Sequence, residues 1–290
     1  MLECVINLSE GRHVDIVDAV AAVAGRTLLD VHSDPFHNRS VLTLAGAGAE
    51  AAARAVAAEA VRLLDISTHE GAHPRLGVVD VVPFVPLSLL GGVAKAEAPQ
   101  GWGDQLGDAL DARGAFVEWF AAQGVPCFSY GPERTLPQIR RSAFRGLAPD
   151  AGPLEPHPTA GACCVGARPL LVAYNLVLAG GGIGLARRIA AELRQPGLRT
   201  LGIEIGDEVQ VSCNLVAPDR LGPAEVYDAV AALAPVARAE LVGLLPRRVL
   251  DQIDPQRWRE LDLDVQTTIE ERLVRARGTR DRESGVTPRT

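Results

Sequence analysis

The chain has 290 residues, of which 47% are hydrophobic and 22% are charged, so it can form one large domain or two smaller ones with substantial cores. Its formal net charge of −7 argues against nucleic acid or an anionic membrane as the main partner, since both require a basic footprint. Five cysteines without a C-x-x-C pair indicate reduced thiols, and no signal peptide or membrane-spanning run is visible, so we expect a cytoplasmic protein.

The first part of the chain predicts the order β-α-β-β-α-β. Strands are expected where apolar residues form short runs, and helices where apolar residues recur every three or four positions. The expected strands cover residues 2–7, 27–32, 40–46 and 78–85, and the expected helices cover residues 13–24 and 49–64. This order is typical of a split βαβ, or ferredoxin-like, unit.

A connecting region follows, with a helix expected near 102–123, a strand at 125–130 and a helix near 136–145. Residues 148–161 (APDAGPLEPHPTAG) then contain four prolines, which exclude a helix or a central strand. The composition favours an interdomain linker. The alternative is a rigid loop at a ligand cleft.

The last part of the chain repeats the order β-α-β-β-α-β. The expected strands cover 170–178, 199–205, 208–216 and 239–245, and the expected helices cover 183–194 and 223–234. We therefore predict an α+β fold made of two ferredoxin-like-related α/β subdomains. The predicted boundaries are 1–168, 169–255, and 256–290 for a C-terminal helix and flexible tail.

All six histidines lie within the first 157 residues, which places any acid–base chemistry there. His69 and His73 occur in S-T-H-E-G-A-H-P-R-L-G (67–77). Their spacing of four suits zinc on a helix, but Gly71 and Pro74 argue against a helix. A metal-dependent hydrolase that uses these two histidines with His32 and His37 remains an alternative.

The segment D-V-H-S-D-P-F-H-N-R-S (30–40) also contains several side chains that can take part in catalysis or substrate binding. In an extended segment Asp30, His32 and Asp34 share one face, and a carboxylate beside an imidazole makes a general acid–base pair. Arg39 could hold a substrate carboxylate with two hydrogen bonds. The alternative is a structural hairpin loop with an Asp-Pro turn.

Several segments together resemble the formiminotransferase domain. They are E-C-V-I-N-L-S-E-G (3–11), L-L-D-V-H-S-D-P-F-H-N-R-S (28–40), H-E-G-A-H-P-R-L-G (69–77), D-V-V-P-F-V-P (80–86), G-A-C-C-V-G-A-R (161–168), L-V-A-Y-N-L (171–176) and V-Q-V-S-C-N-L (209–215). The similarity covers roughly residues 2–250 in order, and the G-x-H-P-R match is specific.

The resemblance implies transfer of a formimino group from N-formimino-L-glutamate to N5 of tetrahydrofolate, the co-substrate, in histidine degradation and one-carbon metabolism. It also implies two α/β subdomains whose sheets flank a ligand cleft, no metal, a homodimer, and no fused cyclodeaminase domain. The family's catalytic histidine falls on His73. The implied substrate-binding residues are Asn7, Asn38, Arg39 and Arg75. The implied folate-binding segment consists of Gly152, Pro153, Leu154, Glu155, Pro156, His157, Pro158, Thr159, Ala160 and Gly161.

One departure from the family bears on catalysis. Family members have D-V-D where this chain has Asp30-Val31-His32, and the second aspartate of the family acts alongside the catalytic histidine. His32 occupies that position, so the expected catalytic set is His73 with His32 and Asp34. The departure also leaves open a paralogue that binds folate without transfer, or one that uses a different donor.

Overall fold

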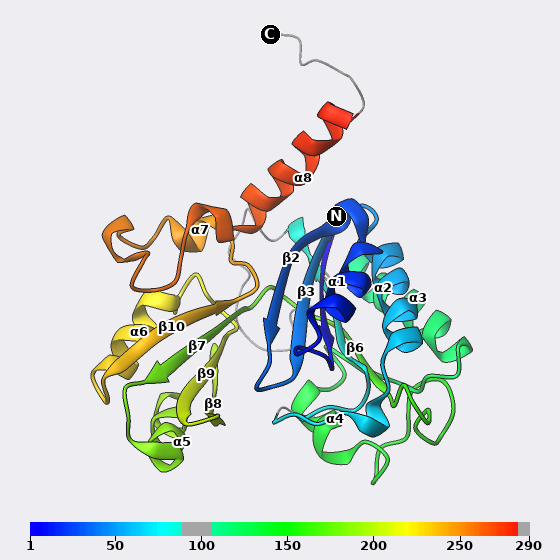
Figure 1. Ribbon diagram of the computed structural model, residues 1–290, viewed down its shortest axis with the longest axis horizontal. Helices are drawn as coiled ribbons and strands as arrows, with labels where there is room; N and C mark the ends of the chain where they lie inside the picture. The colour runs from blue at the N-terminus through cyan, green and yellow to red at the C-terminus, as the bar shows by residue number, and fades with distance from the viewer. Residues whose placement is uncertain (73, 89–105, 284–290) are drawn as a thin grey trace. The chain divides into compact units, whose positions relative to one another are not determined.

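The computed structural model describes residues 1–72, 74–88 and 106–283 of the chain (Figure 1). It is an α+β protein that divides into two compact units, one ending at Pro169 and the other beginning at Leu170. Within the described residues the first unit has a six-stranded sheet and the second a four-stranded sheet.

The sheet of the first unit has the strand order β2-β3-β1-β4-β6-β5. Its strands are β1 (Leu2–Leu8), β2 (Leu28–Asp34), β3 (Arg39–Gly46), β4 (Val79–Pro86), β5 (Cys127–Tyr130) and β6 (Cys163–Ala167). β1 pairs antiparallel with β3 and β4, and β2 pairs antiparallel with β3, whereas β6 runs parallel to β4 and β5. The sequence patterns predicted the first five of these strands and missed β6.

Helices cover one face of this sheet, as Figure 1 shows for α1, α2 and α3. The helices of the unit are α1 (Val14–Ala22), α2 (Ala49–Leu63), α3 (Gly107–Ala122) and α4 (Leu136–Ser142), with short 3-10 helices η1 (Gly25–Thr27) and η2 (Ile66–Thr68). In α2 the buried Ala53, Val56, Ala57 and Ala60 recur every three or four residues, which gives the helix one apolar face. On the other face of the sheet, Ile139 of α4 belongs to a smaller apolar cluster.

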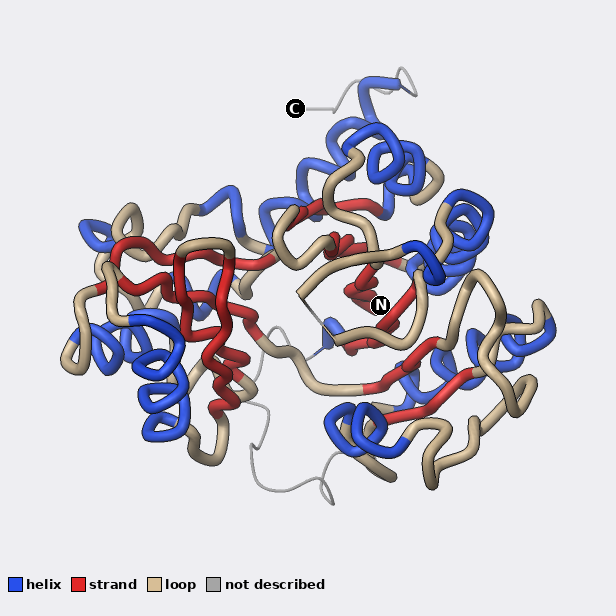
Figure 2. Tube along the Cα trace, turned by 60° about the horizontal axis from the view of Figure 1, so that its bottom comes forward, coloured by secondary structure: helices blue, strands red, loops and turns tan. Residues whose placement is uncertain are grey.

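The sheet of the second unit is antiparallel throughout, with the order β10-β7-β9-β8. Its strands are β7 (Val172–Leu178), β8 (Leu198–Ile205), β9 (Glu208–Leu215) and β10 (Val236–Val242). Its helices are α5 (Gly182–Leu193), α6 (Pro223–Ala231), α7 (Arg247–Leu250) and α8 (Ile269–Glu283), with 3-10 helices η6 (Pro255–Arg257) and η7 (Val265–Thr267). Figure 2 shows the helices and strands of both units in a second orientation.

The two sheets share one topology. In each β-α-β-β-α-β unit the first strand lies between the third and the fourth, and the second strand lies beyond the third. β5 and β6 extend this arrangement in the first unit. The predicted α+β fold with two ferredoxin-like-related subdomains is therefore confirmed.

Four segments differ from the prediction or extend beyond the described residues. The strand expected at 239–245 is β10 at Val236–Val242, because Gly243 adopts a left-handed conformation with φ of 81° and ends the strand. The proline-rich segment 148–161 belongs to the first unit and forms isolated bridges with it, so it is not a free linker. The start of the expected helix 102–123 and the end of the expected tail lie outside the described residues.

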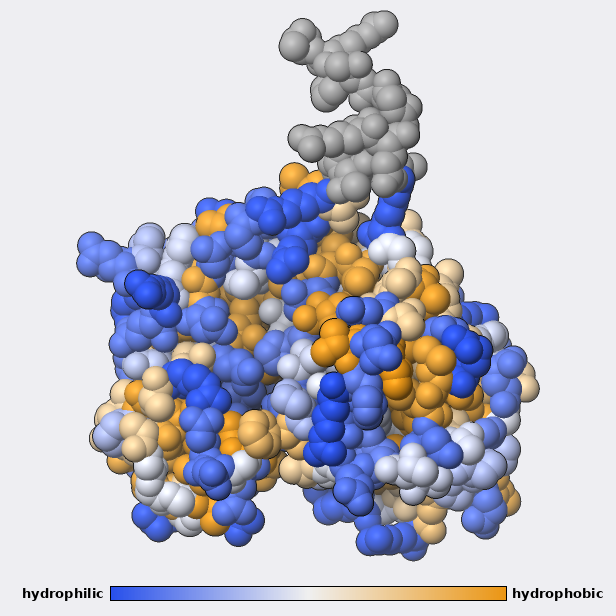
Figure 3. Space-filling view, in the orientation of Figure 1, coloured by the Kyte–Doolittle hydropathy of each residue, from blue (hydrophilic) through white to orange (hydrophobic). Residues whose placement is uncertain are grey.

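The surface is mainly polar on the face drawn in Figure 3, where hydrophilic side chains are interspersed with small apolar areas. No described helix combines the length and the apolar character that crossing a bilayer requires.

Candidate active site

Four polar segments of the first unit meet at one end of its sheet. They are the β1–α1 loop (9–13), the β2–β3 turn (35–38), the connection from α2 to β4 (64–78) and the segment 157–161. Antiparallel pairing brings the first three together, because β1 ends where β3 and β4 begin. The fourth precedes β6, which runs parallel to β4 and so begins at the same end. The first three overlap segments that resemble the formiminotransferase domain, and the fourth belongs to the folate-binding segment that the resemblance implies.

Backbone hydrogen bonds hold the segment 157–161 against the α2–β4 connection. The Ile66 N–H donates to the Thr159 carbonyl at 2.7 Å, and the Val78 N–H donates to the Ala160 carbonyl at 2.9 Å. Gly77 sits so close to the Ala160 and Ala162 carbonyls that a Cβ atom there would clash with backbone. The end of the expected folate-binding segment therefore packs on the loop that carries His73.

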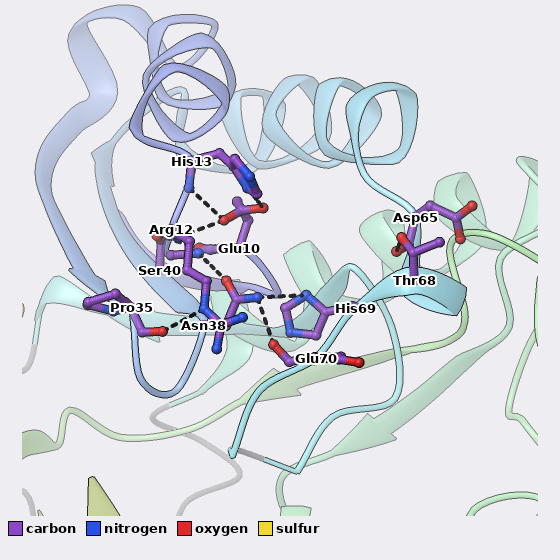
Figure 4. Close-up of polar contacts among 11 residues, drawn as sticks. Glu10, Arg12, His13, Pro35, Asn38, Ser40, Asp65, Thr68, His69 and Glu70 are labelled. Carbon is purple, nitrogen blue, oxygen red and sulfur yellow. Dashed lines mark hydrogen bonds and ion pairs between the residues drawn. The ribbon is translucent and has the colours of Figure 1, made fainter. Parts of the chain in front are cut away.

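Asn38 connects three of the four segments (Figure 4). Its Oδ1 accepts from the Gly11 N–H at 2.9 Å, and its Nδ2 donates to the Glu70 carbonyl at 2.8 Å and faces His69 Nδ1 at 3.5 Å. The residue is 6% exposed and has φ of 48°, a left-handed conformation that asparagine tolerates better than most residues. Asn38 was expected to bind substrate, and its side chain is engaged with these loops.

Asp34 ends β2, and its carboxylate is held by the turn that follows. Oδ2 accepts from Nδ1 of the buried His37, and Oδ1 accepts from the backbone N–H groups of Phe36 and His37 at 2.8 and 2.9 Å. Burial alone would raise the pKa of Asp34, but the hydrogen bonds from His37 outweigh it and lower the pKa to about 2. A carboxylate with this pKa is ionised at neutral pH and is a weak base.

We expect Asp34→Asn to destabilise the protein by about 1–2 kcal/mol at pH 7, because the hydrogen-bonded carboxylate is lost. The folded-state pKa lies below the unfolded value, so the carboxylate stabilises the fold above about pH 4. That contribution disappears as the pH falls towards about 2. Urea unfolding of wild type and variant between pH 7 and pH 3 measures it. A stability difference that grows on acidification contradicts the prediction.

His32 lies in the middle of the edge strand β2 and pairs in register with Val41, which pairs in turn with Asn7. Cross-strand partners point to the same face, so His32 and Asn7 share the face opposite to α1–α3. Strand alternation puts Asp30 and Asp34 on this face as well, as the sequence pattern predicted.

A second charged group lies beside the α2–β4 connection. Asp80 of β4 is 1% exposed, and its carboxylate accepts two hydrogen bonds from Arg140 of α4 and one from the Leu76 N–H at 2.7 Å. Partial burial lowers the pKa of the Arg75 guanidinium; the charge of Asp80 opposes this effect, and those of Arg140 and Arg12 add to it. Arg12 donates from Nε to the Pro35 carbonyl at 2.9 Å.

Other predicted site residues are placed as follows. His73 lies outside the described residues. Arg39 begins β3 and pairs in register with Asp34. In the expected folate-binding segment, residues 152–156 are exposed, whereas His157 Nδ1 accepts from the Ala160 N–H at 3.0 Å and closes a tight turn. Across the part of the chain that is described, no group of three or more His, Cys, Asp or Glu side chains could hold a metal ion.

The sequence patterns missed three residues that shape this region. Glu10 accepts from the Arg12 and His13 N–H groups at 2.7 and 2.9 Å and so fixes the start of α1. Asp80 and Arg140 form the buried ion pair. The sequence does contain a signal for this pair, because Asp80 is the one charged residue in the apolar run V-V-D-V-V-P-F-V (78–85). A charge buried in such a strand needs a partner of opposite charge.

Comparisons with known proteins match most of the chain. The profile of the formiminotransferase domain, N-terminal subdomain, matches residues 1–168. The glutamate formimidoyltransferase of Streptococcus pyogenes serotype M1 is 31% identical over 302 residues, which cover 93% of this chain and 97% of that protein. The glutamate formimidoyltransferase of Thermoplasma acidophilum is 32% identical over 286 residues, which cover 86% of this chain and 89% of that protein. The formimidoyltransferase-cyclodeaminase of Sus scrofa is 33% identical over 293 residues, and the match spans 51% of its length.

Proposed function

Because the chain belongs to the formiminotransferase family and is a transferase of that class, we propose that it moves the formimino group of N-formimino-L-glutamate to N5 of tetrahydrofolate. The observation that supports this most is the convergence of four family-like segments at one end of a single sheet. The G-A-H-P-R loop (71–75) and the expected folate-binding segment (152–161) are far apart in the sequence, and backbone hydrogen bonds join their neighbourhoods.

In the proposed reaction the N5 amine of the folate attacks the formimino carbon and forms a new C–N bond. The bond from that carbon to the glutamate nitrogen then breaks. One proton must leave N5 and one must reach the departing nitrogen. His73 takes the first and supplies the second, because an imidazole can both accept and donate a proton near neutral pH.

The proposed roles of the other residues follow their positions. His32, with Asn7 on the same sheet face, faces the substrate, and Asp34 holds the turn through His37 rather than accepting a proton. Arg39 and Arg75 offset the charge of the carboxylates that both substrates carry. Residues 152–161 contact the folate.

The test is a steady-state assay of glutamate release with a panel of formimino donors. We expect wild-type protein to release glutamate from N-formimino-L-glutamate only when tetrahydrofolate is present. Absence of turnover with every donor, despite folate binding by calorimetry, would favour the second candidate, a paralogue that binds folate without transfer. That candidate draws support from His32, which stands where the family has aspartate.

The variant His32→Asp separates the two candidates. We expect it to keep turnover, since an aspartate at this position of β2 restores the family residue on the same sheet face. Turnover that appears only in His32→Asp identifies the natural chain as the non-transferring paralogue. Val31→Thr, on the opposite and exposed face of β2, is the matched control.

A further inference from the structure

His69 follows η2, and its backbone N–H donates to the Ile66 carbonyl at 3.2 Å. Its half-buried ring lies beside the Asn38 amide, with Nδ1 3.5 Å from Asn38 Nδ2 (Figure 4). Which ring nitrogen carries the proton depends on the group that faces Nδ1.

Two backbone groups fix the orientation of the Asn38 amide. The Gly11 N–H can only donate, so the atom it reaches at 2.9 Å must be the amide oxygen. The Glu70 carbonyl can only accept, so the atom 2.8 Å from it must be the amide nitrogen. The amide therefore cannot be flipped, and a donor hydrogen faces His69 Nδ1.

An imidazole nitrogen that faces a donor must present its lone pair. His69 is thus a neutral ring with its proton on Nε2, and a second proton on Nδ1 would bring two donors together. Nε2 is shielded from solvent and finds no hydrogen-bond partner within the described residues. A buried donor that lacks an acceptor in a native protein calls for an explanation, and a bound ligand supplies one.

We propose that the Nε2–H of His69 donates a hydrogen bond to a carboxylate or carbonyl oxygen of a bound substrate. The inference rests on the proposed function, since N-formimino-L-glutamate and tetrahydrofolate both carry such oxygens. His69 is in the segment that carries the G-A-H-P-R motif, and Asn38 ties it to the β1–α1 loop and the β2–β3 turn. His69 is therefore a fixed donor that binds substrate, and the proton-transfer role is left to His73.

The tautomer is tested first and without substrate. Two-bond ¹H–¹⁵N correlation spectra of ¹⁵N-histidine-labelled protein distinguish Nε2–H from Nδ1–H rings, and the spectrum of His69→Gln assigns the His69 signals by their loss. We expect the Nε2–H pattern. A proton on Nδ1 overturns the inference whatever the protein catalyses.

The contact is tested with His69→Gln and His69→Leu. Glutamine carries an amide donor close to the position of Nε2, whereas leucine carries none. We expect His69→Leu to raise KM, or the calorimetric dissociation constant, for one of the two substrates by about 5- to 150-fold. We expect His69→Gln to retain most of the affinity, and His13→Gln, which alters an exposed ring held by Glu10, to match wild type.

Two outcomes overturn the contact. One is wild-type affinity for both substrates in a folded His69→Leu protein, with folding checked by its melting temperature. The other is an equal loss of affinity in His69→Gln and His69→Leu. If the contact is a donated hydrogen bond, glutamine should retain most of it and leucine should not. Calorimetry measures substrate affinity even if the wild-type protein transfers no formimino group. Failure of the proposed function can therefore be distinguished from failure of this inference.

Discussion

Replacing His73 by glutamine is expected to lower kcat of formimino transfer by about 10²–10⁴-fold, because general acid–base catalysis by a positioned side chain contributes that much. Glutamine keeps polarity and reach but cannot take up and release a proton near pH 7. Steady-state glutamate release at saturating concentrations of both substrates measures the effect. KM should change less than kcat, since the lost interaction belongs to the transition state.

The described residues on both sides of His73 are held by neighbouring segments of the first unit. Gly71 packs against the His37 carbonyl, so closely that a Cβ atom there would clash with it. On the other side the Leu76 N–H binds Asp80, and the Leu76 carbonyl accepts from the Ala162 N–H at 2.9 Å. Gly71 is thus packed on the β2–β3 turn, and Leu76 is bound to β4 and to the segment before β6.

The controls for His73 use a small molecule and a second histidine. Imidazole added to His73→Ala should restore part of the rate, because it supplies the missing proton carrier in solution. His13→Gln should keep the wild-type rate, since its ring is exposed. Full turnover by His73→Ala removes His73 from the mechanism.

Local sequence patterns predicted the strands and helices whose apolar residues form a short run or recur at a regular spacing. β1 was expected at 2–7 and is Leu2–Leu8, and α2 was expected at 49–64 and is Ala49–Leu63. β8 and β9 were recognised from the glycine turn between them, where Gly206 has φ of 60°. These signals lie within a few residues of the element that they specify.

β6 could not be predicted in the same way. Its sequence C-C-V-G-A is five residues long and buried throughout, so it shows no alternation, and it directly follows a proline-rich segment. β6 adopts a strand conformation because it pairs in parallel with β4 and β5, and those strands lie far away in the sequence.

The candidate site was predictable in its residue types and not in its contacts. Strand alternation correctly placed His32 and Asp34 on one face. The contact of His37 with the Asp34 carboxylate forms inside the turn between β2 and β3, which no periodic pattern reveals. The Asp80–Arg140 pair joins residues 60 positions apart, and only the packing of α4 on the sheet brings them together.

The second large effect is expected at this pair. Asp80 has a side chain only 2% exposed, and Arg140 is 17% exposed. Arg140→Met leaves a buried carboxylate with the Leu76 N–H as its remaining partner among the hydrogen bonds described above. Breaking a buried ion pair in this way costs about 3–5 kcal/mol. Urea unfolding of the variant at pH 7 should show a loss of this size.

The matched control is Arg134→Met, which breaks the bidentate pair with Asp150 in the same unit. Those side chains are 26% and 29% exposed, so water can solvate the carboxylate that remains, and we expect a loss below about 1 kcal/mol. Equal losses of unfolding free energy in the two variants would show that the buried pair stabilises the protein no more than the exposed pair does.

The double variant Asp80→Asn with Arg140→Met distinguishes charge burial from lost packing. It removes both charges, and the asparagine oxygen can still accept from the Leu76 N–H, so most of the stability should return. Transfer activity should return with it if the hydrogen bond to Leu76 holds the loop after His73 in place. If stability returns and activity does not, one of the two removed charges contributes to activity directly or through the neighbouring Arg75.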